Sequence, residues 1–390
     1  MSFKIPYGKQ FISQEDTDAV IEALHSDFLT QGPKIAEFEA NFASYIGSKY
    51  AVAVANGTAA LHLPFLAIGL NSTHRIITSP ITFAASANSA RYCGAEVHFA
   101  DIDPDTYVIS IESIKVLLRS HPKGFFKAIV PVDFTGFPVD LEELRTLADE
   151  YNLFILEDAC HSPGGYFIDS KGLQQNCGNC QFADAAIFSF HPVKHIAAGE
   201  GGMITTNNEA LYRKLLNLRT HGITRENFVM DFPEPEKQGG WYYEMQELGF
   251  NYRLTDIQAA LANSQLKRAE GGIQERQRIA STYRFAFSGN PKIKLQAEKE
   301  GFFNAYHLFV IEVENRKGLY DFLKSNGIYS QVHYIPLHLM PYYQQYGWKV
   351  GDFPHAELYY NKCLSLPMFP TLSIGEQNFV IEKVLKFING

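Results

Sequence analysis

The chain has 390 residues, of which 46% are hydrophobic and 19% are charged, with a formal net charge of −8 and a pI near 5.9. This is enough chain for a large core and two domains, and the acidic balance argues against a dedicated nucleic-acid surface, which needs clustered Lys and Arg. No apolar run approaches the ~18 residues of a spanning helix, and the first ten residues lack a signal-peptide pattern, so we expect no membrane segment and a cytoplasmic location.

Between residues 50 and 221, short apolar runs alternate with segments of helical periodicity. The runs, in chain order, are YAVAVAN, RIITSP, VHFADID, AIVPVDF, LFILEDA and AAIFSF. Strands rich in Val, Ile, Ala and Phe, most of them followed by a helix, predict an α/β fold with a mostly parallel sheet that is covered on both faces.

The later part of the chain predicts a smaller α+β domain. Residues 255–288 have helical periodicity interrupted by Gly271 and Gly272, where we expect a hinge. A strand (AYHLFVIEV), a helix (KGLYDFLKSNG), a second strand (YSQVHYIP) and a closing helix (IGEQNFVIEKVLKFI) follow. We therefore predict a large domain over 1–250 and a small domain over 251–390, linked by a long helix. The irregular stretch 224–247 is long enough to be a functional or partner-facing loop.

Five cysteines in a long chain do not indicate a disulfide framework. Cys177 and Cys180, in CGNC, have the spacing of a redox or metal site, but no second pair matches them. We interpret them as part of a reduced surface loop.

Residues that could carry chemistry follow the apolar runs, where open α/β sheets bind their ligands. In NGTAAL, Gly57 allows a tight turn, and Thr58 opens a helix whose N–H groups suit a phosphate, although the motif alone favours an ordinary capped helix start. In LFILEDACHS, Asp158 and His161 end an apolar strand, so the carboxylate needs a cationic or N–H partner; a structural cap or half of a metal site remains an alternative.

The stretch SFHPVKHIAAGEGGM places Ser189 and Lys194 after the last apolar run. A strand end and its turn can aim a hydroxyl and an amine into one pocket, and a desolvated lysine is the usual requirement for Schiff-base chemistry. Three glycines, Gly199, Gly201 and Gly202, are interpreted as space for a bulky ligand. Phe83, near a helix start, could cover a planar ring or simply lie in the core.

Together these residues supply a helix start that suits a phosphate, a carboxylate, an amine and an aromatic ring. These are the groups that pyridoxal 5'-phosphate needs. A metal hydrolase built from Asp158, His161, His191 and His195 is the less favoured interpretation, because the flanking histidines would have to find room around an amine. We therefore predict no metal.

The motifs NGTAALHL, EDACHSPGG, FSFHPVKHIAAGEGG and GFNYRLTDIQAALANSQL resemble the DegT/StrS family of nucleotide-sugar aminotransferases, and the resemblance extends over nearly the whole chain. It implies an aspartate-aminotransferase-like (fold type I) pyridoxal-phosphate-dependent transferase. Within the family, FLTQGPKIAEFEANFASYIG and SFHPVKHI are most similar to the members that aminate the UDP-linked sugar of pseudaminic acid biosynthesis.

The resemblance also implies roles for individual residues. Lys194 matches the Schiff-base lysine, so the chain is not one of the relatives that carry His there and act as dehydratases. Asp158 matches the partner of the pyridinium nitrogen, His161 lies near the phenolic oxygen, and Phe83 stacks on the ring. Phosphate contacts are expected from Thr58, Ala59 and Ser189 and, in the neighbouring subunit's site, from Asn251, which makes a homodimer obligatory.

The implied reaction moves an amino group from L-glutamate to carbon 4 of a UDP-4-keto-6-deoxy-N-acetylhexosamine, preferably UDP-2-acetamido-2,6-dideoxy-β-L-arabino-hex-4-ulose. Candidate sugar contacts are Tyr7, Thr30, Gln31 and His333, with Arg225 for the diphosphate; ordinary loop or core roles remain open for each. The alternatives are another UDP-, dTDP- or GDP-linked keto sugar, or a pyridoxal-phosphate-bound sensor without turnover.

Overall fold

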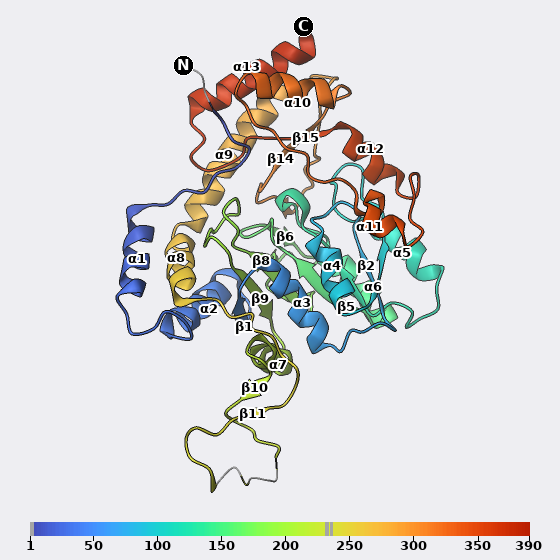
Figure 1. The fold of residues 1–390 in the computed structure, drawn as a ribbon. Coiled ribbons are helices and arrows are strands. Elements are labelled where there is room, and N and C mark those ends of the chain that lie inside the picture. The colour runs from blue at the N-terminus through green and yellow to red at the C-terminus, as the bar shows by residue number, and fades with distance from the viewer. Residues whose placement is uncertain (1–3, 231–233, 235–236) are drawn as a thin grey trace.

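The computed structural model describes residues 4–230, 234 and 237–390. Its centre is a seven-stranded sheet (Figure 1) with the strand order β1-β9-β8-β5-β4-β2-β3. The strands are β1 (Tyr50–Val54), β2 (Arg75–Thr78), β3 (Glu96–Phe99), β4 (Ala128–Val130), β5 (Phe154–Asp158), β8 (Ala185–Ser189) and β9 (Gly202–Thr206). Only β9 runs antiparallel to its neighbours, so the predicted mostly parallel α/β sheet is confirmed.

Helices are distributed along the whole chain, and they lie on both sides of this sheet in Figure 1. They are α1 (Gln14–Leu24), α2 (Pro33–Ile46), α3 (Gly57–Ala67), α4 (Ala85–Tyr92), α5 (Ile111–Arg119), α6 (Leu141–Tyr151), α7 (Glu209–Arg219), α8 (Asp256–Leu266), α9 (Ala269–Phe287), α10 (Arg316–Ser325), α11 (Pro341–Gln344), α12 (Pro354–Lys362) and α13 (Ile374–Asn389), with short 3₁₀ turns at Phe134–Gly136 and Leu337–Leu339. Among the described helices, none is both long and apolar enough to cross a membrane.

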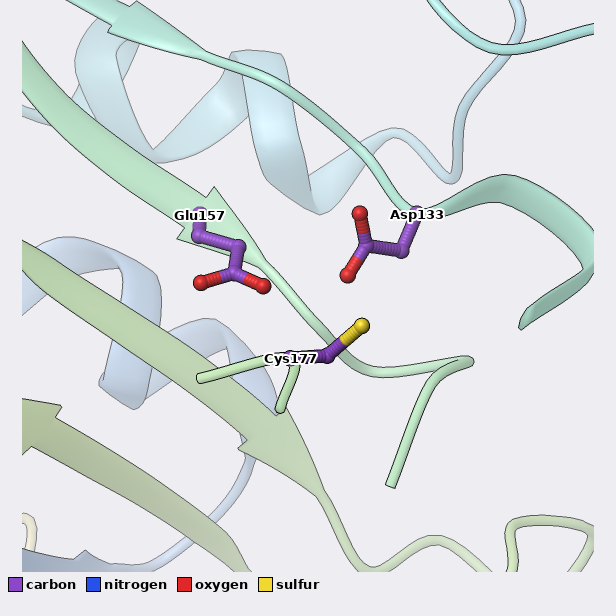
Figure 2. A group of neighbouring side chains, drawn as sticks. All are labelled: Asp133, Glu157 and Cys177. Atoms are coloured by element: carbon purple, nitrogen blue, oxygen red, sulfur yellow. The ribbon is translucent and has the colours of Figure 1, made fainter. Parts of the chain in front are cut away.

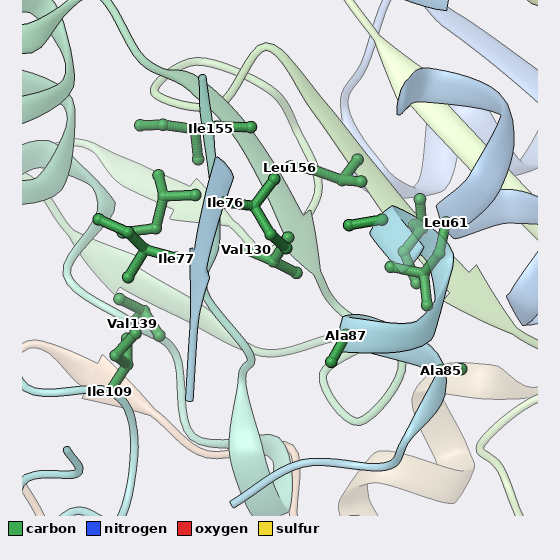
Figure 3. Packing of buried hydrophobic residues seen from close by; sticks show 14 of the residues in the cluster. Leu61, Ile76, Ile77, Ala85, Ala87, Ile109, Val130, Val139, Ile155 and Leu156 are labelled. Carbon is green, nitrogen blue, oxygen red and sulfur yellow. The ribbon is translucent and has the colours of Figure 1, made fainter. Parts of the chain in front are cut away.

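The sheet is buried on both faces because successive strand residues point in opposite directions. In β1, Val52 and Val54 belong to one hydrophobic cluster, whereas Ala51 and Ala53 belong to another that includes Phe38 and Phe42 of α2. Figure 3 shows the same alternation in β2, where Ile76 and Ile77 extend from opposite sides of the strand. This double burial explains why the strands read as continuous apolar runs.

A second, smaller core lies around the sheet of β12 (Lys294–Leu295), β14 (Phe309–Glu312) and β15 (Cys363–Leu366). Residues of α9, α10 and α13 pack in it, and so does Ile5 from the start of the chain. The predicted division into 1–250 and 251–390 stays a prediction; in the structure α8 packs against α1 and α2, on the side of the large sheet.

Two further small sheets complete the fold. One consists of β13 (Phe302–Phe303), β6 (Tyr166–Ile168) and β7 (Gln174–Asn176). The other pairs β10 (Ile223–Thr224) with β11 (Glu244–Met245), and this hairpin projects from the body of the molecule at the bottom of Figure 1. It corresponds to the predicted long loop 224–247, part of which lies outside the described residues.

Three local expectations were wrong. Gly271 and Gly272 lie inside α9, and the helical segment instead breaks at Lys267 and Arg268, between α8 and α9. The segment YSQVHYIP is not a strand: the neighbour of β14 is β15, and residues 328–335 pair with the backbone of β15 through the isolated bridge between Gln331 and Ser365. Cys177 and Cys180 are buried rather than on the surface, since CGNC packs beneath the large sheet, against α2 and β8.

Candidate active site

A buried carboxylate marks the carboxyl end of the central strand β5. Asp158 Oδ2 accepts a hydrogen bond of 2.7 Å from Ser86 Oγ, and Oδ1 accepts one of 3.2 Å from the Cys160 N–H. Ser86 lies in the first turn of α4 and is itself 2.7 Å from Thr82 Oγ1. A buried charge needs such hydrogen-bond donors. Ser86 was not predicted from the sequence, because no local motif links it to residue 158.

Lys194 lies in the turn that follows β8, where its N–H bonds to His191 O at 2.8 Å. Its Nζ is 3.5 Å from His307 Nε2. Burial lowers the pKa of the Lys194 amine, and the charge of Arg276 acts in the same direction, whereas Cys160 and Asp158 oppose the shift. A larger neutral fraction is what a lysine needs in order to form a Schiff base.

Three histidines surround this amine. The ring centroids of His161 and His307 are 4.3 Å apart and those of His195 and His307 are 5.7 Å apart. Burial lowers the pKa of all three well below the ordinary value, so each ring is neutral at pH 7. Nδ1 of each is buried with no hydrogen-bond partner among the described residues. Sequence reasoning missed His307, which precedes β14 in an ordinary-looking apolar run.

The start of α3 lies beside Ser189. A Cβ placed on Gly57 would be 3.0 Å from Ser189 Cβ and 3.3 Å from its Oγ. The helix is capped by Asn56, whose Oδ1 accepts from the Ala59 N–H at 2.8 Å, and not by Thr58. The Ala59 N–H is therefore already bonded, and the donors without an acceptor at this helix end, within the described chain, belong to Gly57 and Thr58.

Aromatic rings form another side of the site. Phe83 is 62% exposed, with its ring 6.2 Å from that of Tyr334, and the Tyr334 hydroxyl is 3.4 Å from His161 Nε2. The Tyr7 and His333 rings are 5.4 Å apart, and His333 Nδ1 is 2.8 Å from Ser365 Oγ. Burial lowers the pKa of His333 to about 3. Phe83, Tyr7 and His333 thus border the cluster around Lys194.

Four of the residues chosen from the sequence are not brought into this cluster within one chain. Thr30 and Gln31 are exposed in the turn before α2, where Thr30 bridges to Thr255. Arg225 is exposed just after β10, and Asn251 is exposed where it bridges to Thr220. Among the described residues, none of the four has a hydrogen bond or ring contact with the cluster.

Of the glycines after Lys194, Gly202 serves backbone geometry, which corrects the expectation that it leaves space for a bulky ligand. A Cβ on Gly202 would lie 2.4 Å from Asn56 O, so glycine is required where β9 passes the start of α3. Gly199 has a φ of +77°, which disfavours any side chain.

A second acidic group is formed by Glu157, the β5 residue before Asp158, together with Asp133 and Cys177 (Figure 2). Their ligand atoms all lie within 4.8 Å of one another. Ser162 Oγ donates to Asp133 Oδ2 at 2.6 Å, and the Gly178 N–H donates to Glu157 Oε1 at 2.9 Å. Burial raises the pKa of Asp133 to about 6 and that of Glu157 well above its ordinary value, so the pair holds a proton. We interpret it as support for the strand end that bears Asp158.

The residues present suit pyridoxal phosphate. The Lys194 amine, with imidazole nitrogens beside it that lack a partner among the described residues, suits an aldehyde. The Asp158 carboxylate, held by the Ser86 hydroxyl, suits a ring nitrogen. Ser189, beside the N-terminus of α3, suits a phosphate.

The chain is similar to known proteins over almost its full length. A model of the DegT/DnrJ/EryC1/StrS aminotransferase family matches residues 10–385. The spore coat polysaccharide biosynthesis protein SpsC of Bacillus subtilis is 37% identical, over 99% of this chain and 97% of its own. The UDP-4-amino-4,6-dideoxy-N-acetyl-beta-L-altrosamine transaminase of Campylobacter jejuni is 33% identical, over 98% and 97%. The solved structure of Helicobacter pylori PseC, described as an aminotransferase involved in the biosynthesis of pseudoaminic acid, is 30% identical with a TM-score of 0.87, and the match covers 99% of this chain and 100% of PseC.

These findings confirm the predicted family, the fold type I architecture and the aminotransferase class. Solved relatives in pyridoxal phosphate and pyridoxamine phosphate forms, together with the family match, confirm the cofactor. The chain belongs to the DegT/DnrJ/EryC1/StrS aminotransferase family.

Proposed function

We propose that this aminotransferase moves an amino group from L-glutamate to carbon 4 of a UDP-4-keto-6-deoxy-N-acetylhexosamine. The observation that carries the proposal is the convergence of the Lys194 amine, the Asp158 carboxylate and the neutral His161 at the carboxyl ends of β5 and β8. Glutamate as donor and a cytoplasmic location stay predictions.

Each residue of the cluster has a role that its surroundings support. Pyridoxal phosphate supplies an electron sink next to the carbon that loses its proton. Lys194 Nζ, favoured in its neutral form by burial, takes the proton from the α-carbon of the amino donor and later returns one to carbon 4 of the sugar. Asp158 offers a carboxylate that keeps a pyridinium nitrogen protonated, and Ser86 fixes its orientation. Ser189 and the start of α3 would hold the phosphate, His161 would contact the phenolic oxygen, and Phe83 would stack on the ring.

The choice of sugar rests on the names of two relatives, the Campylobacter jejuni transaminase and the Helicobacter pylori PseC structure. The preferred acceptor is therefore UDP-2-acetamido-2,6-dideoxy-β-L-arabino-hex-4-ulose. The sugar contacts we propose are Tyr7 and His333, which border the cluster, and Thr30, Gln31 and Arg225. The similarity to SpsC supports a second candidate, another keto nucleotide sugar used for a surface polysaccharide.

We also propose that two copies of the chain share their active sites. Asn251 is exposed, and among the described residues it has no hydrogen bond with the Lys194 cluster of its own chain, which is the arrangement expected if it reaches a partner's cofactor. Apolar side chains around the projecting hairpin are open for such contact: Trp241 is 73%, Met245 63% and Leu248 78% exposed.

A substrate panel tests the proposed reaction. Purified protein would be incubated with glutamate and UDP-, dTDP- or GDP-linked 4-keto-6-deoxy sugars of both configurations at carbon 5, and amino-sugar products would be detected by mass spectrometry. We expect the highest kcat/KM with the UDP-linked L-arabino ketose. Preference for another base or epimer would move the assignment to the second candidate, and cofactor binding without turnover on any ketose would favour the sensor.

A further inference from the structure

Arg276 of α9 is a fully enclosed cation close to the candidate active site. Its side chain is only 2% exposed. Nη1 donates to three backbone carbonyl oxygens, at 3.1 Å to Tyr306, 3.3 Å to His307 and 3.3 Å to Met368. Nε is buried and has no partner in the described part of the chain.

No Asp or Glu among the described residues forms an ion pair with this guanidinium. Enclosing a charge without a counter-ion costs several kcal/mol in general. Burial lowers the pKa of Arg276 to about 10, which still leaves the group charged at neutral pH. A residue that is this costly to bury and contributes no ion pair is expected to serve the site next to it.

The charge and the hydrogen bonds of Arg276 both act on the amine of Lys194. The positive charge lowers the pKa of Lys194, His195 and His307. Its bonds to the carbonyl groups of Tyr306 and His307 fix the backbone that carries the His307 ring, whose Nε2 is 3.5 Å from Lys194 Nζ.

Resting on the proposed role of Lys194, we propose that Arg276 is a positioning residue for transamination. Its carbonyl contacts hold His307 against the Lys194 amine, and its fixed charge adds to the effect of burial in opposing protonation there.

Other titratable groups lie around the Lys194 amine, and some of them favour its protonated form. Asp158 and Cys160 favour the protonated amine. His161, His195, His307 and His333 are neutral, because burial lowers the pKa of each. Within the described residues, Arg276 is therefore the one permanent cation that opposes Asp158 at this amine.

The test is the pH dependence of cofactor uptake by the full-length apoprotein. Only the unprotonated amine attacks an aldehyde, so the rate of Schiff-base formation with pyridoxal phosphate, followed by absorbance, reports the neutral fraction of Lys194. Arg276→Gln removes the charge and keeps hydrogen-bond donors for the carbonyl groups, whereas Arg276→Lys keeps the charge. Arg278→Gln is the matched control, since Arg278 lies on the same helix and pairs with Glu275 at 2.8 Å.

We expect Arg276→Gln to move the midpoint of the pH profile upward; at pH 7, uptake would slow about tenfold for each unit of that shift. Arg276→Lys and Arg278→Gln should keep the wild-type midpoint. An unchanged midpoint in a folded Arg276→Gln variant would overturn the proposal, and so would a higher KM for glutamate with no change in midpoint, which would make Arg276 a carboxylate-binding residue instead.

Replacement of a buried cation can unfold a chain, so Arg276→Met serves as a second variant without the charge. A raised midpoint in a folded neutral variant together with a wild-type midpoint in Arg276→Lys supports the role of the charge, and a midpoint one unit higher in Arg276→Lys contradicts it. Failure of the proposed function is visible separately, because wild-type protein would then transfer no amino group to any ketose of the panel, whatever the midpoint of its cofactor uptake.

Discussion

The hydroxyl of Ser86 donates to the carboxylate of Asp158 across 2.7 Å, joining the first turn of α4 to the end of β5. Because the carboxylate is buried, this donor contributes to its orientation. Loss of a hydrogen bond to a charged group costs about 1.5–3 kcal/mol.

We therefore expect Ser86→Ala to lower kcat/KM by roughly tenfold to a hundredfold, in line with that cost. Steady-state kinetics with a saturating amino donor measure the effect. Ser89→Ala is the control, since the Ser89 hydroxyl lies on the same helix and donates, within the described chain, to Ser86 O and not to Asp158. Equal kcat/KM in the two variants would contradict the role given to Ser86.

Lys194→Ala should keep the fold and lose turnover by at least about a thousandfold, because it removes the proposed covalent anchor and proton carrier. Single-turnover assays and the melting temperature measure the two effects. The exposed pair of Lys317 with Asp321 provides a control, Lys317→Ala. A Lys194→Ala enzyme with near-normal activity would end the assignment.

Phe83→Ala should weaken cofactor binding by only about threefold to tenfold, since one aromatic stacking contact contributes about 0.5–1.5 kcal/mol. Phe83 is 62% exposed, so the free energy of unfolding should change little. Titration of apoprotein with pyridoxal phosphate measures the affinity. Phe285→Ala, at an 88% exposed phenylalanine of α9, is the control and should bind normally.

The Asp133 and Glu157 pair makes stability depend on pH. The folded pKa of Asp133, about 6, is raised above the unfolded value of 3.8. The folded state therefore binds more protons, and stability falls as the pH rises from about 4 to 6. Asp133→Asn cannot ionise, so its urea midpoint should decline less between pH 4 and 7. At pH 7 the variant should be more stable by about 1–3 kcal/mol.

Asp149→Asn, at a side chain that is 70% exposed, should keep the wild-type pH dependence and is the control. A steeper decline of stability in Asp133→Asn than in the wild type would show that the pair holds no proton in the folded chain.

Shared active sites predict complementation between two inactive variants. Lys194→Ala and Asn251→Ala homodimers should each be impaired, but unfolding and refolding a mixture yields heterodimers in which one of the two sites is intact. A symmetric dimer then regains up to about a quarter of wild-type activity. Activity that stays at the average of the two parents would contradict the contribution of Asn251 to a partner's site.

Residues of the candidate site differ in how far the sequence could predict them. Asp158 and Ser189 end two apolar strands, and Lys194 lies in the turn after the second of them, so the strand pattern places all three at one sheet edge. Ser86, His307 and Arg276 were missed because their roles come from packing between distant segments: Ser86 is 72 residues from Asp158, and His307 is 113 residues from Lys194. No local periodicity reports such contacts.

The predicted fold shows the same limit. Strands of the large sheet were predicted because burial on both faces gives each one an uninterrupted apolar run. β15 was missed in favour of YSQVHYIP, since both segments contain apolar residues and only tertiary packing selects which one pairs with β14.

The pairing of Ile5 with the segment at Ile328 sets an order of events during synthesis. The Ile5 N–H bonds to Gly327 O at 2.9 Å, and its carbonyl accepts from the Tyr329 N–H at 2.8 Å, while the side chain is enclosed with residues as late as Val384. Ile5 therefore acquires these neighbours only after the long stretch of chain between the two segments has been made. Until then, the smaller core stays open on the side that the amino-terminal segment closes.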